Sequence, residues 1–299
     1  MKNILIIGGT GTLGKEVTKQ LLVEGHKISI LTRNPEKNIQ ITEGGIQIIK
    51  GDLTDAASLQ SACKGMEIVI AAAHSLLGKG KYSSEKVDDK GHRDLIDAAK
   101  AAGVQHFIYA SVIGASLDSP IDFWRTKAKV EEYLKQSGLN YTILRGAAFM
   151  EFHVHEMIGK SVLAKGKATI LGKGENPANF VSVRDVSQYA VLSFKNSELR
   201  NKTLEIGGLD NLSRNEIAAL YGELVDKTVK ISHIPRGVLR VFSTILKPFH
   251  AGISRVMAVS EYFDRIDTSF DMRPTLVKYP IHPLRLRDFM EEKVAEIRI

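Results

Sequence analysis

A glycine-rich turn joins an apolar strand to a helix at the start of this chain. Residues 3–7 are largely apolar, GGTGTLG follows at 8–14, and apolar residues then recur at helical spacing at Val17, Leu21 and Leu22. Such a turn needs glycine for unusual backbone angles, for close approach of a phosphate and for packing of the helix on the strand. The helix N-terminus adds free N–H groups and a positive dipole end. The segment therefore predicts a dinucleotide-binding unit.

The glycines of this turn fit a dinucleotide site in two registers. Either Gly8 or Gly9 supplies the tight turn, while Gly11 and Gly14 keep their places in both. A bound phosphate needs the backbone N–H groups at the start of the helix, so the residues between Gly11 and Gly14 belong to the same site. The predicted pyrophosphate contacts are Gly8, Gly11, Thr12, Leu13 and Gly14.

The composition is that of a soluble, enzyme-sized protein. The chain has 299 residues, of which 43% are hydrophobic and 25% charged, enough for one large domain or two. Its single cysteine, Cys63, excludes an internal disulfide, and its small and apolar neighbours predict a buried thiol in a reducing compartment. Neither a signal-peptide pattern nor a run of about 18 apolar residues occurs. We therefore expect a cytoplasmic protein.

The net charge of +7 suits an anionic cofactor better than a nucleic acid. Lysines and arginines are interleaved with acidic residues through most of the chain, and no run of five basic residues occurs. A nucleic-acid-binding protein gathers its cations on one face or along one helix. We expect no nucleic-acid partner.

Short β-rich runs alternate with helical patterns through the first half of the chain. This order is typical of a parallel sheet with crossover helices. Strands are predicted at residues 3–7, 27–32, 46–50, 67–72, 106–110 and 141–144. Helices are predicted between them at residues 12–24, 56–64, 85–102 and 121–137. Six strands divide naturally into two mononucleotide-binding halves.

The regular alternation ends after Arg145. The later elements are a helix at 151–165, a short strand at 169–171, a loop at 172–179, a strand and helix at 180–194 and a seventh strand at 203–206. Ser213 and Glu216 form a capping box for a helix that ends near Val225, and the remainder reads as helical with prolines. We expect a dinucleotide-binding domain at 1–145 plus 180–207, and a substrate or lid part at 146–179 plus 208–299.

Six segments resemble the NmrA-like group of atypical short-chain dehydrogenase/reductases. They are GGTGTLG at 8–14, LTRNP at 31–35, GDLTD at 51–55, VDDKGHRDLIDAAKAAGVQHFIYAS at 87–111, TKAKVEEYLKQSGLNYTILRGAAFME at 126–151 and FVSVRDV at 180–186. The resemblance covers the first two thirds of the chain and implies a doubly wound Rossmann sheet, of the α/β class, with an NAD(P) cofactor. It leaves the reaction open, because the group contains both reductases and proteins that bind the cofactor without turning it over.

Arg33 stands at the end of the second predicted strand, where a fold selecting NAD commonly places Asp or Glu. Its guanidinium cannot accept hydrogen bonds from a ribose 2′-hydroxyl, but it offers a fork of donors and a permanent charge that suit a 2′-phosphate. We therefore expect NADP (NADPH), with Lys37 as a weaker second contact. The alternative is a solvated arginine at a strand end.

Two further cofactor contacts are implied by the resemblance. Asp52 would accept a hydrogen bond from the adenine amino group, with Leu53 beside the ring. Asp52 could instead cap the following helix, although Thr54 or Asp55 is better placed for that. Ala72 follows the fourth strand at its carboxyl end, where a small side chain lets the backbone approach the nicotinamide-side ribose. Packing of small residues against a helix explains Ala72 almost equally well.

The segment from Ser111 to Lys127 bears on the chemistry. In the wider superfamily that the chain resembles, a Ser or Thr after the fifth strand works with a Tyr-x-x-x-Lys helix, whose Tyr donates a proton while Lys binds the ribose. Here Phe123 replaces that Tyr, and a phenyl ring has no proton to donate. Lys127 then holds the ribose or transfers the proton itself, unless it is a solvated helix lysine. Tyr82, in the loop after the fourth strand, is a substitute acid or a packing residue.

The run MEFHVHE at 150–156 raises the question of a metal site. On a helix, His153 and His155 point about 200° apart, which is a poor arrangement for one metal ion. We predict no metal and expect this segment to line the substrate pocket or to form an ordinary amphipathic surface.

An apolar stripe with basic flanks runs through residues 236–262. Such a stripe can lie on an anionic membrane, but it packs more often as a lid over a substrate cleft or as the face of a homodimer. Membrane contact is therefore the less favoured expectation.

These patterns favour an NADPH-dependent reductase of a small carbonyl or quinone-like substrate. Phe123 motivates one alternative, a regulatory or redox-sensing NADP-binding module without turnover. The stripe at 236–247 motivates another, a peripheral membrane or assembly factor.

Overall fold

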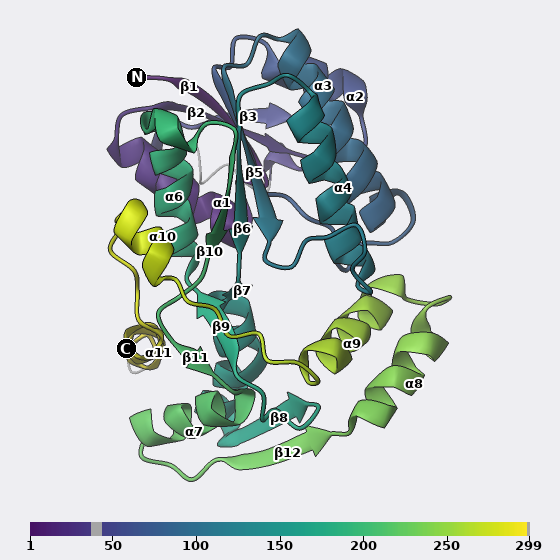
Figure 1. Cartoon of the computed structure of the whole chain (residues 1–299), viewed down its shortest axis with the longest axis vertical. Coiled ribbons are helices and arrows are strands. Elements are labelled where there is room, and N and C mark those ends of the chain that lie inside the picture. The colour runs from purple at the N-terminus through teal and green to yellow at the C-terminus, as the bar shows by residue number, and fades with distance from the viewer. Residues whose placement is uncertain (37–43, 298–299) are drawn as a thin grey trace. The chain divides into compact units, whose positions relative to one another are not determined.

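The computed structural model describes residues 1–36 and 44–297 (Figure 1). The chain forms two compact units, each of which we describe by itself. The first comprises Met1–Arg145 and Val186–Glu205, and the second comprises Gly146–Asp185 and the chain from Ile206 onward. Residues 180–185, which the sequence analysis assigns to the dinucleotide-binding part, lie in the second unit.

A seven-stranded sheet forms the centre of the first unit. Its order is β10-β6-β5-β4-β1-β2-β3, and the registers of β1 with β2 and β4, of β2 with β3 and of β4 with β5 are all parallel. This is the doubly wound Rossmann arrangement that the sequence predicts. The strands are β1 Asn3–Ile7, β2 Lys27–Thr32, β3 Gln47–Lys50, β4 Ile68–Ala71, β5 His106–Val112, β6 Tyr141–Gly146 and β10 Lys202–Ile206.

Helices cover both faces of this sheet, and its central strands β1 and β4 are accordingly almost entirely apolar. In Figure 1, α1 and α6 lie on one face and α2, α3 and α4 on the other. The four residues of β4 are all buried, and Ile4 of β1 lies between Ile28 and Ile68 in register. The helices are α1 Thr12–Val23, α2 Ala56–Cys63, α3 His92–Ala101, α4 Asp122–Gln136 and α6 Val183–Lys195, with short 3-10 turns at Gly80–Tyr82 (η2) and Ser197–Leu199 (η5).

The predicted helix at 85–102 is two helices of different winding. Glu85–Gly91 (η3) has the wider π-helical hydrogen-bond pattern, and α3 continues from it. Gly91 lies so close to the backbone of Leu53 that a Cβ atom there would stand 2.6 Å from the Leu53 carbonyl oxygen. This contact between distant segments is not visible in a local helical pattern.

The second unit packs helices against two small sheets around a separate core. Its sheets have the orders β11-β9-β7 and β12-β8. The strands are β7 Ala148–Phe149, β8 Lys167–Leu171, β9 Ala178–Val181, β11 Asn211–Leu212 and β12 Lys230–Ile234. The helices are η4 Met150–Gly159, α5 Lys160–Lys165, α7 Arg214–Leu224, α8 Arg236–Leu246, α9 Ala251–Phe263, α10 Arg273–Lys278 and α11 Leu286–Ala295.

In this unit the predicted capping box is confirmed, whereas the helical prediction for one later segment is wrong. The capping box at the start of α7 is present, because the Ser213 hydroxyl accepts from the Glu216 N–H and the Glu216 carboxylate accepts from the Ser213 N–H. The stretch Lys230–Ile234 was expected to be helical but is β12, paired in parallel with β8. A five-residue strand whose partner lies some 60 residues earlier carries too weak a local signal to be recognised.

Candidate functional site

The glycine turn places a bare helix N-terminus at the carboxyl end of β1. Gly8 has a φ of +86°, so the tight turn falls at Gly8, while a Cβ atom at Gly9 would stand 2.7 Å from the Ile30 side chain. A Cβ atom at Gly14 would lie 2.1 Å from the Gly8 carbonyl oxygen, because α1 packs directly on the turn. Glycine is therefore required at Gly8 and Gly14 for different reasons.

The first N–H groups of α1 have no side-chain cap. Gly11 is the N-cap residue and has no side-chain oxygen, and its own N–H donates to the Gly8 carbonyl at 2.9 Å. Thr12 and Leu13 form the first helical turn behind it. Uncapped N–H groups at the positive end of a helix are the arrangement that binds a phosphate. At Gly11 a Cβ atom would meet only the Gly8 oxygen, at 3.3 Å, so packing alone does not demand glycine there.

Arg33 follows β2, and its guanidinium lies 4.3 Å from the centre of the Tyr82 ring. The ammonium of Lys81 lies 4.8 Å from the same ring. The Tyr82 hydroxyl raises the pKa of Lys81 through a hydrogen bond. The structure thus gathers two cations and an aromatic ring beside the end of β2.

Lys81 is a residue that the sequence analysis missed. It lies in η2, far along the chain from Arg33, and only the fold brings the two cations together. The short sequence GKGKY at 78–82 is the sole signal that could have drawn attention to it. Lys37, the second contact expected from the sequence, lies outside the described residues.

Asp52 does not cap α2. The Asp55 carboxylate does so by accepting from the Ala57 N–H at 3.1 Å. The Asp52 carboxylate instead accepts from the Thr54 N–H at 2.9 Å and so closes a short turn at the end of β3. Leu53 is buried in the core of the first unit.

The backbone after β4 lies against the glycine turn. The Ala72 N–H donates to the Ile7 carbonyl at 2.9 Å, which continues the pairing of β4 with β1 by one residue. A Cβ atom at Gly8 would stand 2.7 Å from the Ala73 nitrogen. Ala72 is thus placed at the same edge of the sheet as the start of α1.

Lys127 is buried in α4, with 3% of its surface exposed, so it is not a solvated helix lysine. Its ammonium donates to the Ala110 carbonyl at 2.8 Å and lies 4.7 Å from the centre of the Tyr109 ring and 5.6 Å from that of Phe123. Burial lowers the pKa of Lys127, and the carboxylates of Asp88 and Glu131 oppose that change.

The Ser111 hydroxyl bonds a buried carboxylate that is also paired with a partly exposed arginine. It donates to the Glu131 carboxylate at 2.5 Å, and the Arg145 guanidinium binds the same carboxylate, with an Nη2 to Oε2 distance of 2.6 Å. The Glu131 hydrogen bonds raise the pKa of Arg145. Glu131 lies one turn after Lys127 on α4. The bond from Ser111 to Glu131 therefore brings Ser111 close to Lys127. Glu131 and Arg145 are not among the site residues predicted from the sequence.

Two buried polar atoms near Lys127 have no hydrogen-bond partner among the described residues. They are the Tyr109 hydroxyl and His92 Nε2, on rings whose centroids lie 5.4 Å apart. His92 Nδ1 bonds the Val87 carbonyl at 2.9 Å, and burial lowers the pKa of His92 to about 4. Burial also raises the pKa of Tyr109. The Tyr109 ring thus packs on the Lys127 ammonium, and the His92 ring packs edge-on against Tyr109.

The two histidines of η4, in the second unit, do not face a common centre. His155 Nδ1 lies 3.4 Å from the Tyr221 hydroxyl, whereas the ring of His153 packs edge-on against Phe152. The carboxylate of Glu151, in the first turn of η4, accepts from the Ser182 hydroxyl and the Val183 N–H. Among the residues that the structure describes, no group of three or more His, Cys, Asp or Glu side chains could hold a metal ion.

No helix within residues 1–36 and 44–297 is both long enough and apolar enough to cross a bilayer.

Two relatives illustrate the range of similar proteins. Photosystem II assembly factor Ycf39 of Guillardia theta is 28% identical over 302 residues, covering 99% of this chain and 95% of the relative. Isoflavone reductase homolog IRL of Zea mays is 33% identical over 251 residues, covering 78% of this chain and 77% of the relative.

A solved structure shares the whole architecture. The NADPH-dependent quinone oxidoreductase QOR2 of Escherichia coli, complexed with NADPH, is 25% identical with a TM-score of 0.78, covering 99% of this chain and 100% of that chain. The model of the NmrA-like family matches residues 1–289. Because that match spans nearly the full length, the protein belongs to the NmrA-like family.

Proposed function

We propose that this protein is an NADPH-dependent reductase whose preferred acceptors are quinone-like. The observation that carries the proposal is the pairing of an uncapped helix N-terminus at Gly11 with the cations of Arg33 and Lys81 beside the end of β2. The first suits a pyrophosphate and the second a 2′-phosphate. The NADPH-bound quinone oxidoreductase of the same fold supports the assignment.

Each cofactor group has a residue that fits it. Gly8, Gly11, Gly14, Thr12 and Leu13 would hold the pyrophosphate. Arg33 would hold the 2′-phosphate, now with Lys81 as its second contact. Asp52 would accept from adenine beside Leu53, and the backbone at Ala72 would approach the nicotinamide ribose. When bound, NADPH supplies the hydride.

Lys127 is the residue that we assign to the reacting end of the cofactor. Its ammonium is held in place by the Ala110 carbonyl, and burial favours loss of its proton. It can therefore bind a ribose hydroxyl or deliver a proton to the reduced acceptor. Phe123 lies beside it without a hydroxyl. A quinone suits such a site, because its reduction needs little help from a general acid.

We assign non-catalytic roles to Ser111 and Tyr82, the other two residues that the sequence offers as catalytic. Ser111 donates to Glu131, so we assign it to positioning α4, and with it Lys127, against β5. Tyr82 stacks on Arg33, at the end that would hold the 2′-phosphate, so we no longer propose it as the acid for the reaction. Tyr82 is better suited to shaping the adenosine side of the site.

A second function is an NADP-binding module that works without turnover. It is favoured because Phe123 has no hydroxyl and the Ser111 hydroxyl already donates to Glu131. Of the three residues at this site, only Lys127 then remains to donate a proton to an acceptor. The similarity to a protein named as an assembly factor agrees with this alternative.

One experiment separates the two functions. NADPH oxidation is followed at steady state with a panel of quinones and aldehydes, and NADPH binding is measured by calorimetry on the same preparation. Turnover with a quinone supports the reductase. Binding without turnover above the buffer rate, with every acceptor, would replace the reductase by the binding module.

A further inference from the structure

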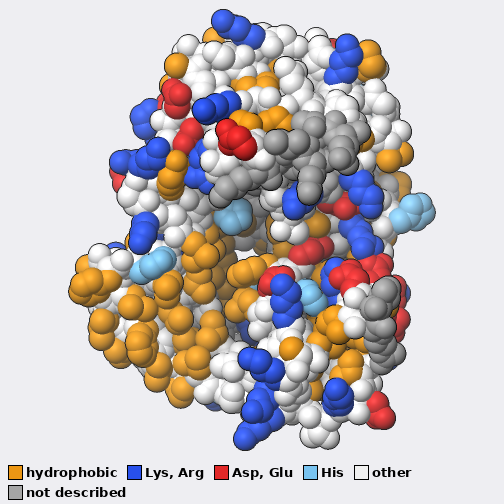
Figure 2. All heavy atoms as spheres, turned by 180° about the vertical axis from the view of Figure 1, so that it is seen from behind, with side chains coloured by type: hydrophobic (Ala, Val, Ile, Leu, Met, Phe, Trp, Pro, Cys, Tyr) orange, Lys and Arg blue, Asp and Glu red, His pale blue; other side chains and the backbone are white. Residues whose placement is uncertain are grey.

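The hairpin of α8 and α9 in the second unit carries the largest set of exposed apolar side chains in the described chain. Figure 2 shows them as a continuous hydrophobic area at the lower left. Phe249, in the turn between the helices, is 79% exposed, and Val241, Phe242 and Ile245 are each about half exposed. We call this set the hairpin face, and its members are Val238, Val241, Phe242, Ile245, Phe249 and Ile253.

The hairpin face follows from helical spacing. Val238, Val241, Phe242 and Ile245 stand at i, i+3, i+4 and i+7 and so share one side of α8. Leu239, on the other side, is 1% exposed. Leu239 thus packs α8 against its unit, whereas the stripe of four apolar residues remains in contact with solvent.

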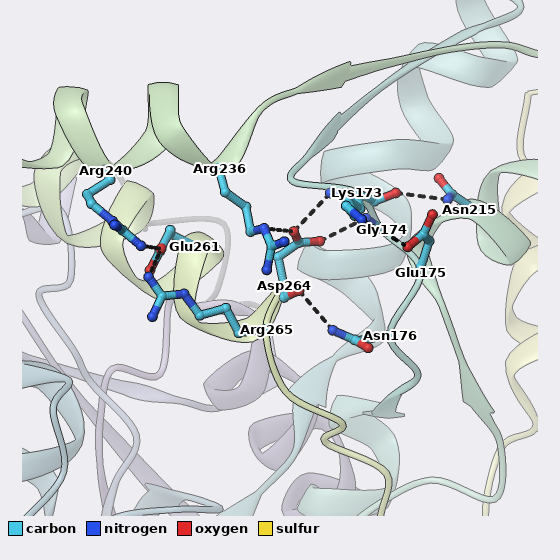
Figure 3. Close-up of polar contacts among 10 residues, drawn as sticks. All are labelled: Lys173, Gly174, Glu175, Asn176, Asn215, Arg236, Arg240, Glu261, Asp264 and Arg265. Carbon is cyan, nitrogen blue, oxygen red and sulfur yellow. Dashed lines mark hydrogen bonds and ion pairs between the residues drawn. The ribbon is translucent and has the colours of Figure 1, made fainter.

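Ion pairs on the polar side hold α8 to α9. Figure 3 shows Glu261 of α9 between the guanidinium groups of Arg240 and Arg265. Arg236, at the start of α8, lies 3.4 Å from the buried carboxylate of Asp264.

Asp264 also ties the hairpin to the rest of its unit. Its carboxylate accepts from the N–H groups of Lys173 and Gly174, at 2.9 and 2.8 Å, in the loop after β8 (Figure 3). The hairpin is therefore anchored to its unit through its polar side. Its apolar side is held in a fixed position and remains exposed.

The segment that carries the hairpin face has a net positive charge. Residues 236–260 contain no Asp or Glu, whereas Arg236, Arg240, Lys247 and Arg255 are cationic. Two of these cations are themselves paired, Arg240 with Glu261 and Arg236 with Asp264. Residues 236–265 nevertheless hold five Lys and Arg against these two carboxylates, a net charge of +3. An apolar face on a segment with a net positive charge is complementary to an anionic lipid surface. Two copies of the face brought together would instead oppose cation to cation.

We propose that the hairpin face binds the surface of an anionic bilayer, with α8 lying in the headgroup region and Phe249 inserted shallowly. Neither helix is long enough to cross a bilayer, so the contact is peripheral. This inference goes beyond the reductase function and does not depend on it, since the residues proposed for NADPH all lie in the first unit.

Vesicle sedimentation tests the proposal with the full chain. One set of vesicles contains phosphatidylglycerol mixed with phosphatidylcholine, and the other phosphatidylcholine alone. We expect the protein to pellet with the anionic vesicles and to remain in solution with the neutral ones. The bound fraction should fall as salt is added, because the surface potential is screened.

Two matched double variants localise the contact. Phe242→Ser with Ile245→Ser should lower the partition coefficient for anionic vesicles at least about tenfold, since each removes exposed apolar surface from the face. Val23→Ser with Val277→Ser removes two isolated apolar side chains, each 86% exposed, and should leave binding unchanged. Circular dichroism and NADPH titration of both variants report that they remain folded.

Three outcomes would overturn the proposal. The wild type could remain in solution with anionic vesicles. A dimer seen by light scattering could dissociate in the Phe242→Ser, Ile245→Ser variant, which would make the face an interface between two copies. The same variant could change KM for a quinone while vesicle binding is absent, which would make the hairpin a substrate lid.

Discussion

The guanidinium of Arg33 stacks on the ring of Tyr82, 4.3 Å from its centre, although 48 residues separate them in the chain. The contact fixes the direction of a side chain that would otherwise be free at a strand end. It also brings Lys81 to the same place, 4.8 Å from the ring. A 2′-phosphate would meet two cations there, and the ring would keep the arginine extended.

Arg33→Ala should weaken NADPH binding and leave NADH binding nearly unchanged. Loss of a charge-assisted pair costs about 1.5 to 3 kcal/mol, which is roughly 10- to 100-fold in affinity. Calorimetric titration of both nucleotides measures this directly. Equal affinities of the wild type for NADH and NADPH would refute the assignment.

Lys81→Ala should reduce NADPH affinity by a smaller factor, about fivefold, because an exposed ion pair contributes at most about 1 kcal/mol. Lys79→Ala, two residues earlier in the same exposed loop, is the matched control and should have no effect. The two variants should differ for NADPH and agree for NADH. An equal loss in both would mean that general positive charge, and not contact, attracts the nucleotide.

Gly11→Val and Gly14→Ala should separate binding from folding. A Cβ atom at Gly14 would overlap the Gly8 carbonyl oxygen, so Gly14→Ala should destabilise the protein by about 1 to 3 kcal/mol or more. Gly11→Val should stay folded, since its Cβ atom meets only one oxygen at 3.3 Å, but should lose NADPH because its branches stand where the phosphate approaches. Thermal unfolding and fluorescence titration give the two readouts. Retained affinity in Gly11→Val would leave the glycine with a purely geometric role.

Lys127→Met should lower kcat/KM for a quinone at least about tenfold while keeping the packing of α4, because methionine fills a similar volume without the charge. The wild type should reduce quinones and leave aliphatic ketones unreduced, since Phe123 removes a proton donor that contributes about 10² to 10⁴ in rate. Phe123→Tyr is the companion variant and should leave quinone turnover within about threefold. Full activity in Lys127→Met would remove the lysine from the mechanism.

His106 should make the protein less stable in acid. Burial lowers its pKa to about 4, and its Nε2 bonds the Thr142 hydroxyl at 2.9 Å. Since the folded pKa lies below the unfolded value of about 6.5, protons bind the unfolded chain first. Stability is therefore lost as the pH falls from about 6.5 to 4, by about 3 kcal/mol for this one group.

His106→Gln should flatten that pH dependence relative to the wild type in urea unfolding at a series of pH values. His233→Gln, on an exposed strand position, is the control and should retain the wild-type slope. Parallel slopes for all three proteins would show that His106 is protonated equally in both states.

Several features follow from the sequence because their causes are local. The strand, the glycine turn and the helix of residues 3–23 require only the backbone freedom of Gly8, the close packing at Gly14 and an apolar helical stripe. The capping box of Ser213 and Glu216 spans four residues and is equally local. The Rossmann order follows from the alternation of strands and helices, because parallel crossovers leave few other arrangements.

Tertiary structure decided what depends on residues far apart in the chain. The burial of Lys127, the engagement of Ser111 by Glu131 and Arg145, and the meeting of Arg33 with Lys81 and Tyr82 need distant segments to be packed together. The sequence predicted an apolar stripe on α8, but a stripe looks the same whether it is covered or exposed. Only the folded chain, in which Leu239 is buried and Phe242 is not, determines which apolar surface remains in contact with solvent.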